Sequence, residues 1–330
     1  MEEMLEQIKY VLSVPETLIS QCLFLPEYVR QTLIDCINFV PWLFFLYYAI
    51  ELLERFFLKN IHLFIRLIRT IGPIFGVVIS VIPECGYQVM VSTFYSRKMI
   101  TRGTLLAFYI SCSDDALPLL FMDLDKAIYI LPIVIIKIVV GLLVAFVVDL
   151  VGLIAHKNTE DINAINTDLN EPACCHHRIM TVENPPYWQT HPLIHTFNMF
   201  MFTLLSLLLI NCIINGFGSV EQLATFLMID SPYQIIGTAI FGLIPNCVVS
   251  IILVLLFMKN LISFPALLAG LVTVTGLGYG TLLKRLPNHK DNYFFAFMLV
   301  ITALGVGYLA YIYPDIVEML KFGLGFNQGV

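Results

Sequence analysis

Residues 76–120 read GVVISVIPECGYQVMVSTFYSRKMITRGTLLAFYISCSDDALPLL. Two apolar runs make up this stretch, and polar or helix-breaking residues interrupt each of them. Pro83, Glu84 and Gly86 interrupt the first run, and Ser111 to Asp115 interrupt the second. A proline in a membrane helix removes a backbone hydrogen bond, and irregular backbone at membrane depth is tolerated only where protein buries it or it lines a cavity. The stretch therefore predicts two broken membrane segments beside a site.

The composition of the whole chain is that of an integral membrane protein. Of its 330 residues, 58% are hydrophobic and 13% are charged, and the mean hydropathy is +0.85. A soluble domain would carry about a quarter charged residues. The net charge of -6 leaves no basic stripe to neutralise phosphates, so a nucleic-acid partner is excluded and the lipid bilayer is the expected surrounding.

Eight apolar stretches have about the 20 residues that a membrane helix needs, which predicts an all-α, multi-pass protein of the plasma (inner) membrane. They lie at roughly 33–57, 71–96, 100–122, 127–154, 193–215, 233–258, 262–283 and 292–313.

The order of these stretches predicts five regions. We expect an amphipathic segment at 1–31, a first transmembrane repeat at 32–154, a polar linker at 155–191, a second repeat at 192–314 and a tail at 315–330. Each repeat would hold about four membrane segments.

The two halves resemble each other. Aligning I-P-E-C with I-P-N-C gives an offset of 162, and eight of the forty pairs between residues 74 and 113 and their counterparts are identical. The same helix breaker, Pro83 or Pro245, and the same thiol, Cys85 or Cys247, thus recur at the same place in each half. Paired broken or re-entrant segments in two halves indicate a transport site, and an odd number of spans per half would make the repeats inverted. The alternative is that the prolines only kink helices against their neighbours.

Charged residues within membrane segments are costly and indicate function. Glu84 lies in the first break, Asp114 and Asp115 lie in the second, and Lys137 lies in the following helix. The three carboxylates predict a hard, oxygen-rich cation site. Lys137 would neutralise the empty site or act as a proton-linked partner, or it forms a structural ion pair with an aspartate. Asp149 is interpreted as a solvated helix end.

The second half lacks these charges, since Asn246 replaces Glu84 and Gly276-Leu277 replace the acidic pair. It would supply amides, hydroxyls and backbone instead. Thiols near the breaks would favour softer metals or trivalent arsenic. The predicted substrate-binding set is Glu84, Cys85, Ser111, Cys112, Ser113, Asp114, Asp115, Lys137, Asn246, Cys247, Thr273 and Thr275.

The linker contains four consecutive candidate metal ligands, Cys174, Cys175, His176 and His177. A tetrahedral zinc site needs spaced ligands, so this run is not a zinc finger. It is either a loose collector of soft metals or a chance cluster in a polar loop.

The 76–120 stretch resembles the ten-transmembrane heavy-metal exporter family, whose members are often called manganese transporters. The resemblance is carried by the I-P-x-C-G break, S-x-x-Y, I-T-x-G-T-L-L-A, and the serine-rich turn with an acidic pair before A-L-P. It implies a metal or metalloid efflux permease, distantly similar to arsenical permeases. Family members often carry a longer His/Cys-rich linker than this chain does.

These observations predict a secondary-active exporter of a divalent transition metal such as manganese. No P-loop or D-K-T-G phosphorylation sequence is present, and the absence of H-E-x-x-H argues against an intramembrane hydrolase, so we expect no enzyme and no cofactor. The alternative cargo is arsenite, an organoarsenical or another small organic anion. Protons are the candidate coupling ion, and a homodimer is a candidate assembly.

Overall fold

The structure is a computed structural model that describes residues 26–59, 67–68, 71–81, 85–112, 117–155, 190–229, 231–286 and 289–322. Every regular element in these ranges is helical, as predicted. In chain order they are α2 (Glu27–Lys59), α4 (Gly72–Ser80), α5 (Cys85–Ser96), α6 (Arg102–Ser111), η1 (Leu117–Met122), α7 (Leu124–Ala127), α8 (Ile130–Ala155), α9 (Thr190–Phe217), α10 (Val220–Phe226), α11 (Pro232–Gly242), α12 (Val248–Met258), α13 (Phe264–Thr273), α14 (Gly276–Arg285), α15 (His289–Ile312) and α16 (Pro314–Phe322).

Within the described residues, five helical stretches are long and apolar enough to cross a membrane. They are Glu27–Ala49, Asp125–Gly152, Thr196–Phe217, Phe264–Arg285 and Lys290–Ile312. Along α8, Leu143, Val147 and Leu150 are more than half exposed. Such a continuous apolar outer face is stable only against lipid, so the prediction of a multi-span helical membrane protein is confirmed.

The predicted helix breaks are present in both halves. In the first half α4 ends at Ser80 and α5 begins at Cys85, and in the second α11 ends at Gly242 and α12 begins after Cys247. The next segments also break: α6 ends at Ser111, and α13 is separated from α14 by two residues. The chain thus forms short helices of about half the bilayer length.

The offset of 162 also relates the helix boundaries. Helix α6 spans Arg102–Ser111 and α13 spans Phe264–Thr273, which are the same positions 162 residues apart. The turns before these helices match as well, because Lys98 (φ 58°) and Asn260 (φ 55°) both adopt the left-handed conformation that closes a Schellman motif. A repeat inferred from weak sequence identity is therefore present in the backbone.

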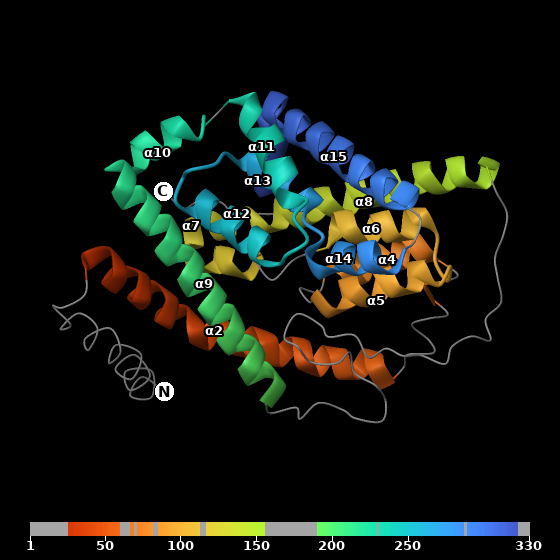
Figure 1. Cartoon of the computed structure of the whole chain (residues 1–330), viewed down its shortest axis with the longest axis horizontal. Coiled ribbons are helices and arrows are strands. Elements are labelled where there is room, and N and C mark those ends of the chain that lie inside the picture. Colours follow the sequence, from red (N-terminus) through yellow and green to blue (C-terminus); the bar gives the residue numbers. More distant parts are fainter. Residues whose placement is uncertain are drawn as a thin grey trace.

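The helices pack in two similar groups. Helices α4, α6 and α8 contact one another in the first half, and α11, α13 and α15 contact one another in the second. Between the halves, α5 packs on α14, α6 meets α13, and α2 crosses α9. Figure 1 shows α4, α5, α6 and α14 gathered on one side of the molecule, with α2 and α9 crossing below. The apolar core runs through both groups, so the halves share one interior.

Candidate functional site

Lys137 lies at the centre of the contact between the two halves. Its side chain is 1% exposed, and Nζ donates hydrogen bonds to two backbone carbonyls, Cys112 O at 2.5 Å and Leu271 O at 2.8 Å. Lys137 comes from α8, Cys112 follows α6, and Leu271 lies in the last turn of α13. One ammonium therefore joins three helices from both halves. We name Lys137 and these two carbonyls the central node.

Helix ends explain why these carbonyls accept from a side chain. The last four carbonyls of an α-helix have no partner within the helix. After α6 the backbone turns extended at Cys112 (φ −56°, ψ 124°), and after α13 it does the same at Val274 (φ −66°, ψ 117°). The partial negative charges of both C-termini thus converge on one point. Such a point stabilises a cation, and here it holds the ammonium of Lys137.

Gln88 on α5 adds a polar side chain beside the node. It is completely buried, and its Nε2 donates to Cys112 Sγ at 3.0 Å. Two glycines of α14 make room for it, because a Cβ atom at Gly276 or Gly278 would collide with Gln88. Gly276 also has φ +48°, a conformation that L side chains rarely adopt. The second half therefore shapes its backbone around a side chain of the first half.

Cys247 approaches the same place from the second half. Its side chain is buried, and a Cβ atom at Gly276 would lie 3.2 Å from its Sγ and 3.2 Å from the Gln88 Cδ. Cys247 is the N-cap residue of α12, where the helix dipole stabilises negative charge. The two buried thiols Cys112 and Cys247, one from each half, thus flank Gln88.

Serine hydroxyls continue the polar environment on the other side of Cys112. Ser111 Oγ lies 2.6 Å from Ser80 Oγ and also donates to Ala107 O. Ser92 Oγ lies 2.7 Å from the hydroxyl of the fully buried Tyr109. Buried hydroxyls are expected to be hydrogen-bonded in this way. They give the first half a polar interior along α5 and α6.

The structure describes only some of the residues that the sequence predicted for the site. Glu84, Ser113, Asp114 and Asp115 lie outside the described residues, as do Cys174, Cys175, His176 and His177 of the linker. Cys85 begins α5, but its side chain also lies outside the description. The residues that the structure brings together are Cys112, Lys137 and Cys247, with Ser111 beside them. The predicted three-carboxylate metal site stays a prediction.

The predicted second-half ligands occupy different environments. Asn246 is exposed, and its Oδ1 accepts from Val248 N, the first residue of α12, at 3.0 Å. Thr273 is buried, with Oγ1 donating to Gly270 O at 2.9 Å, and Thr275 is buried at the start of α14. What the second half places at the node is a backbone carbonyl, that of Leu271.

Two participants were missed by the sequence reasoning. The Leu271 carbonyl carries no side-chain signal at all. Gln88 did have one: it follows Cys85 by three residues, so both share a helix face within an apolar segment. Asp149 was also interpreted incompletely, because its carboxylate accepts from Gly103 N at 2.9 Å and from Thr101 Oγ1 at 2.7 Å. From α8 it accepts hydrogen bonds at the N-terminus of α6, next to the N-cap residue Thr101, and is more than a solvated helix end.

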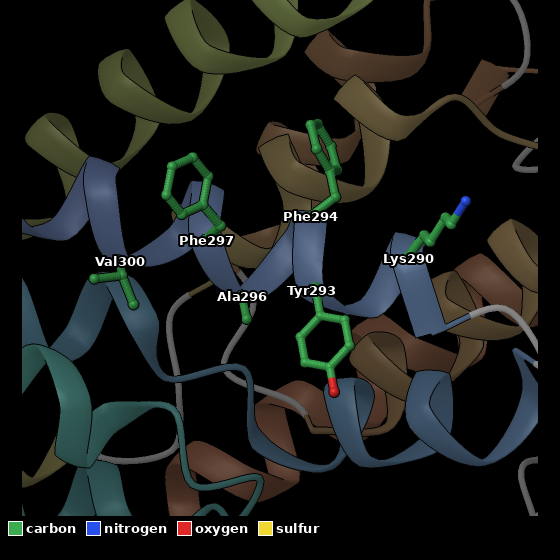
Figure 2. A pocket seen from close by; sticks show the side chains of 6 residues that line it. All are labelled: Lys290, Tyr293, Phe294, Ala296, Phe297 and Val300. Carbon is green, nitrogen blue, oxygen red and sulfur yellow. The ribbon is translucent and has the colours of Figure 1, made fainter.

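Among the described residues, no group of three or more His, Cys, Asp and Glu side chains could hold a metal ion. A hollow of about 590 Å³ lies elsewhere and is lined only by α15 residues, including Tyr293, Phe294 and Phe297. Figure 2 shows these aromatic side chains projecting to different sides of the helix instead of enclosing a site. The hollow is a surface feature of one helix, whereas the buried polar and ionisable groups lie at and beside the node.

No curated protein and no solved structure is similar enough to this chain to match it. The sequence profile of a family described as "Putative, 10TM heavy-metal exporter" matches residues 24–214, which is more than half of the chain. The match includes α4 to α8 and therefore both first-half breaks and Lys137. A set of short, broken helices around a buried lysine in a lipid-facing bundle agrees with such a membrane role. The chain belongs to this family of heavy-metal exporters.

Proposed function

We propose that this protein exports a divalent transition metal such as Mn²⁺ across the plasma membrane as a secondary-active transporter, and that the metal passes the central node. The observation that carries the proposal is the convergence of two helix C-termini on one buried ammonium. Broken membrane helices bind cations through the negative ends of their helix dipoles and through backbone carbonyls at the break. Lys137 would hold this place while the site is empty.

The carboxylates of the first half supply the rest of the argument. Asp114 and Asp115 follow Cys112 directly in the chain after Ser113, and Glu84 immediately precedes α5, which contributes Gln88. Carboxylate and carbonyl oxygens are the ligands that Mn²⁺ prefers. A metal bound by two of these acids would repel the ammonium and displace Lys137 from the carbonyls.

The repeated half-helices favour alternating access as the mechanism. Helices α6 and α13 are related by the repeat, and their C-terminal ends meet at Lys137. If each helix enters the membrane from a different face, the halves are inverted, and rocking one half against the other opens the node to either side. No nucleotide-binding sequence is present, so an ion gradient, with protons as the candidate, would drive export.

A second candidate cargo is a thiophilic metal or trivalent metalloid. It is favoured by the position of Gln88 between the thiols of Cys112 and Cys247. Thiolates bind soft ions, and the N-terminus of α12 beside Cys247 would stabilise a thiolate. This cargo would use the sulfur side of the site, while Mn²⁺ would use the carboxylate side.

The test is export of Mn²⁺ from proteoliposomes or everted vesicles with and without a pH gradient. The Asp114→Asn variant should lose export, because it removes a charged ligand at nearly unchanged volume. Asp315→Asn is the matched control, since Asp315 is exposed in the first turn of α16. Export by Asp114→Asn at the control rate would move the site away from the second break.

The two cargoes are separated by a second pair of variants. Changing both Cys112 and Cys247 to Ser should leave Mn²⁺ export within a few-fold of the wild type if oxygen ligands carry the ion. The same change should abolish protection of cells against trivalent arsenite if sulfur ligands carry the cargo.

A further inference from the structure

Arg102 connects the two halves at one end of the bundle. At the start of α6, its guanidinium forms an ion pair with Asp291 of α15, with 2.5 Å between Nη2 and Oδ1. The same guanidinium lies 5.4 Å from the centre of the Phe294 ring, and Nε donates to the Tyr95 hydroxyl at 3.4 Å. Tyr95 in turn packs edge-on against Phe295, 5.0 Å between ring centres.

A different cation connects the halves elsewhere. Lys126 of α7 donates to Asn260 Oδ1 at 2.7 Å, and its ammonium lies 4.8 Å from the centre of the Phe257 ring. Phe257 packs edge-on against Tyr129, 5.2 Å between ring centres. Lys126 and Tyr129 belong to the first half, whereas Phe257 and Asn260 belong to the second. Both contacts therefore join the two halves.

The repeat relates these two contacts. Tyr95 lies in the last turn of α5 and Phe257 in the last turn of α12, and the two residues are 162 positions apart, so they are equivalent. Each packs edge-on against an aromatic residue of the opposite half at nearly the same distance and angle, 89° for Tyr95 with Phe295 and 83° for Phe257 with Tyr129. The same aromatic contact thus occurs twice, each time between equivalent helix ends and the other half.

Helix α8 runs from one contact to the other, so its length gives the distance between them. It is continuous from Ile130 to Ala155, so Tyr129 lies at its start, while Asp149 near its other end caps α6 beside Arg102. Twenty residues of helix rise about 30 Å, which is the thickness of the hydrocarbon core. Lys137 lies on the same helix between them, about 12 Å from Tyr129 by the same rise. The two contacts are therefore separated along α8 by about the thickness of the hydrocarbon core, with the node between them.

We propose that these contacts are the two gates of the transport path. The first gate comprises Tyr95, Arg102, Asp291, Phe294 and Phe295, and the second comprises Lys126, Tyr129, Phe257 and Asn260. This rests on the proposed function, since gates are meaningful only for a cargo that passes the node. Each gate joins the halves over one side of Lys137, and export requires the two to separate in turn.

Reversible cross-links test this proposal. In full-length protein in proteoliposomes, Arg102→Cys is combined with Asp291→Cys, and Lys126→Cys with Asn260→Cys. A bifunctional thiosulfonate reagent then bridges each pair, and mass spectrometry verifies the bridge. Each bridge should cause complete loss of Mn²⁺ export, and dithiothreitol should restore it. Where the first pair does not insert, Tyr95→Cys with Phe295→Cys tests the same gate.

The matched control lies at the same end of the molecule but within one half. Thr101→Cys combined with Asp149→Cys bridges α6 to α8 across a hydrogen bond of 2.7 Å. This bridge should leave export at the rate of the reduced protein, since both helices belong to the first half. If a bridged gate exports as fast as its reduced form, the proposal is overturned. If wild-type protein and unbridged single variants do not export Mn²⁺, the proposed function fails instead.

Discussion

Helices α4 to α6 and helices α11 to α13 share one backbone plan but differ in chemistry. Helices α6 and α13 have equivalent bounds, and the turns before them have equivalent left-handed residues. Yet the first set contributes Gln88 and Cys112 and is followed by two aspartates, whereas the second set is followed by Gly276. Backbone symmetry creates the meeting point of two helix ends, and the asymmetric side chains determine what that point can bind.

The largest expected effect comes from replacing Lys137, a charged residue whose equivalent in the second half is uncharged. Lys137→Met removes the hydrogen bonds that Nζ donates to the Cys112 and Leu271 carbonyls. Each lost bond to a buried carbonyl should lower the free energy of unfolding by about 1–3 kcal/mol. Export should be lost. Leu299 lies 162 residues later and is fully buried, and Leu299→Met should cost less than about 1.5 kcal/mol. Transport assays and thermal unfolding of both purified variants check this, and equal effects would refute the asymmetry.

A smaller effect, on stability, is expected at the glycine of α14 that packs against Gln88 of the first half. Gly276→Ala combines a positive φ with a collision against Gln88, which should cost about 1–3 kcal/mol of stability. Gly280 is the control on the same helix, since its added Cβ would meet only Pro245 at an ordinary 3.5 Å. The melting temperatures in detergent report the difference. If Gly276→Ala and Gly280→Ala have the same melting temperature, the close packing of α14 against Gln88 does not limit the residue at position 276.

The equivalent positions Gln88 and Ser250 should differ more modestly. Gln88 reaches across to Cys112 Sγ, whereas Ser250 donates only to Cys247 O within its own turn. Gln88→Leu should lose about 0.5–1.5 kcal/mol of site stabilisation, a two- to tenfold rise in the apparent KM for metal. Ser250→Ala should leave KM near the wild-type value. The metal dependence of export distinguishes the two, and an unchanged KM in Gln88→Leu would remove Gln88 from the site.

The smallest effect is expected from changes in the linker that joins the two halves. Cys174 to His177 lie in a polar run that cannot bury a core, far in sequence from either break. Replacing all four by Ser should leave maximal export intact and at most raise the metal concentration needed, because a collector changes only the local supply. A metal titration of export separates a shifted curve from a lost one. A lost curve would place obligatory ligands in the linker instead of in the halves.

Several features of the fold were predictable because their signals are local. Pro83 and Pro245 predict breaks in their apolar runs, and each lies between two successive helices, whereas Gly86 lies within α5. The offset of 162 was visible in the paired I-P-x-C sequences, and the bounds of α6 and α13 follow the same offset. Lys137 was singled out because a charge in an apolar helix is costly wherever its partners lie.

The partners of Lys137 were not predictable in the same way. Two partners of Lys137 are the backbone carbonyls of Cys112 and Leu271, while the predicted carboxylates Glu84, Asp114 and Asp115 lie outside the described residues. Every residue has a backbone carbonyl, so nothing in the sequence marks the two that helix ends leave available. Asn246 forms a local hydrogen bond, because its Oδ1 accepts from Val248 N, and its predicted role at the site stays a prediction.

Composition, proline and charge act through local physics, and they are sufficient to predict a helical membrane protein of two related halves with broken segments in each. The convergence of the α6 and α13 C-termini on one lysine, the space that α14 leaves for Gln88, and the contact of Arg102 with Asp291, 189 residues away, are visible only in the folded molecule. Such contacts depend on how rigid helices pack in three dimensions. That packing depends on many side chains at once, and no single stretch of sequence encodes it.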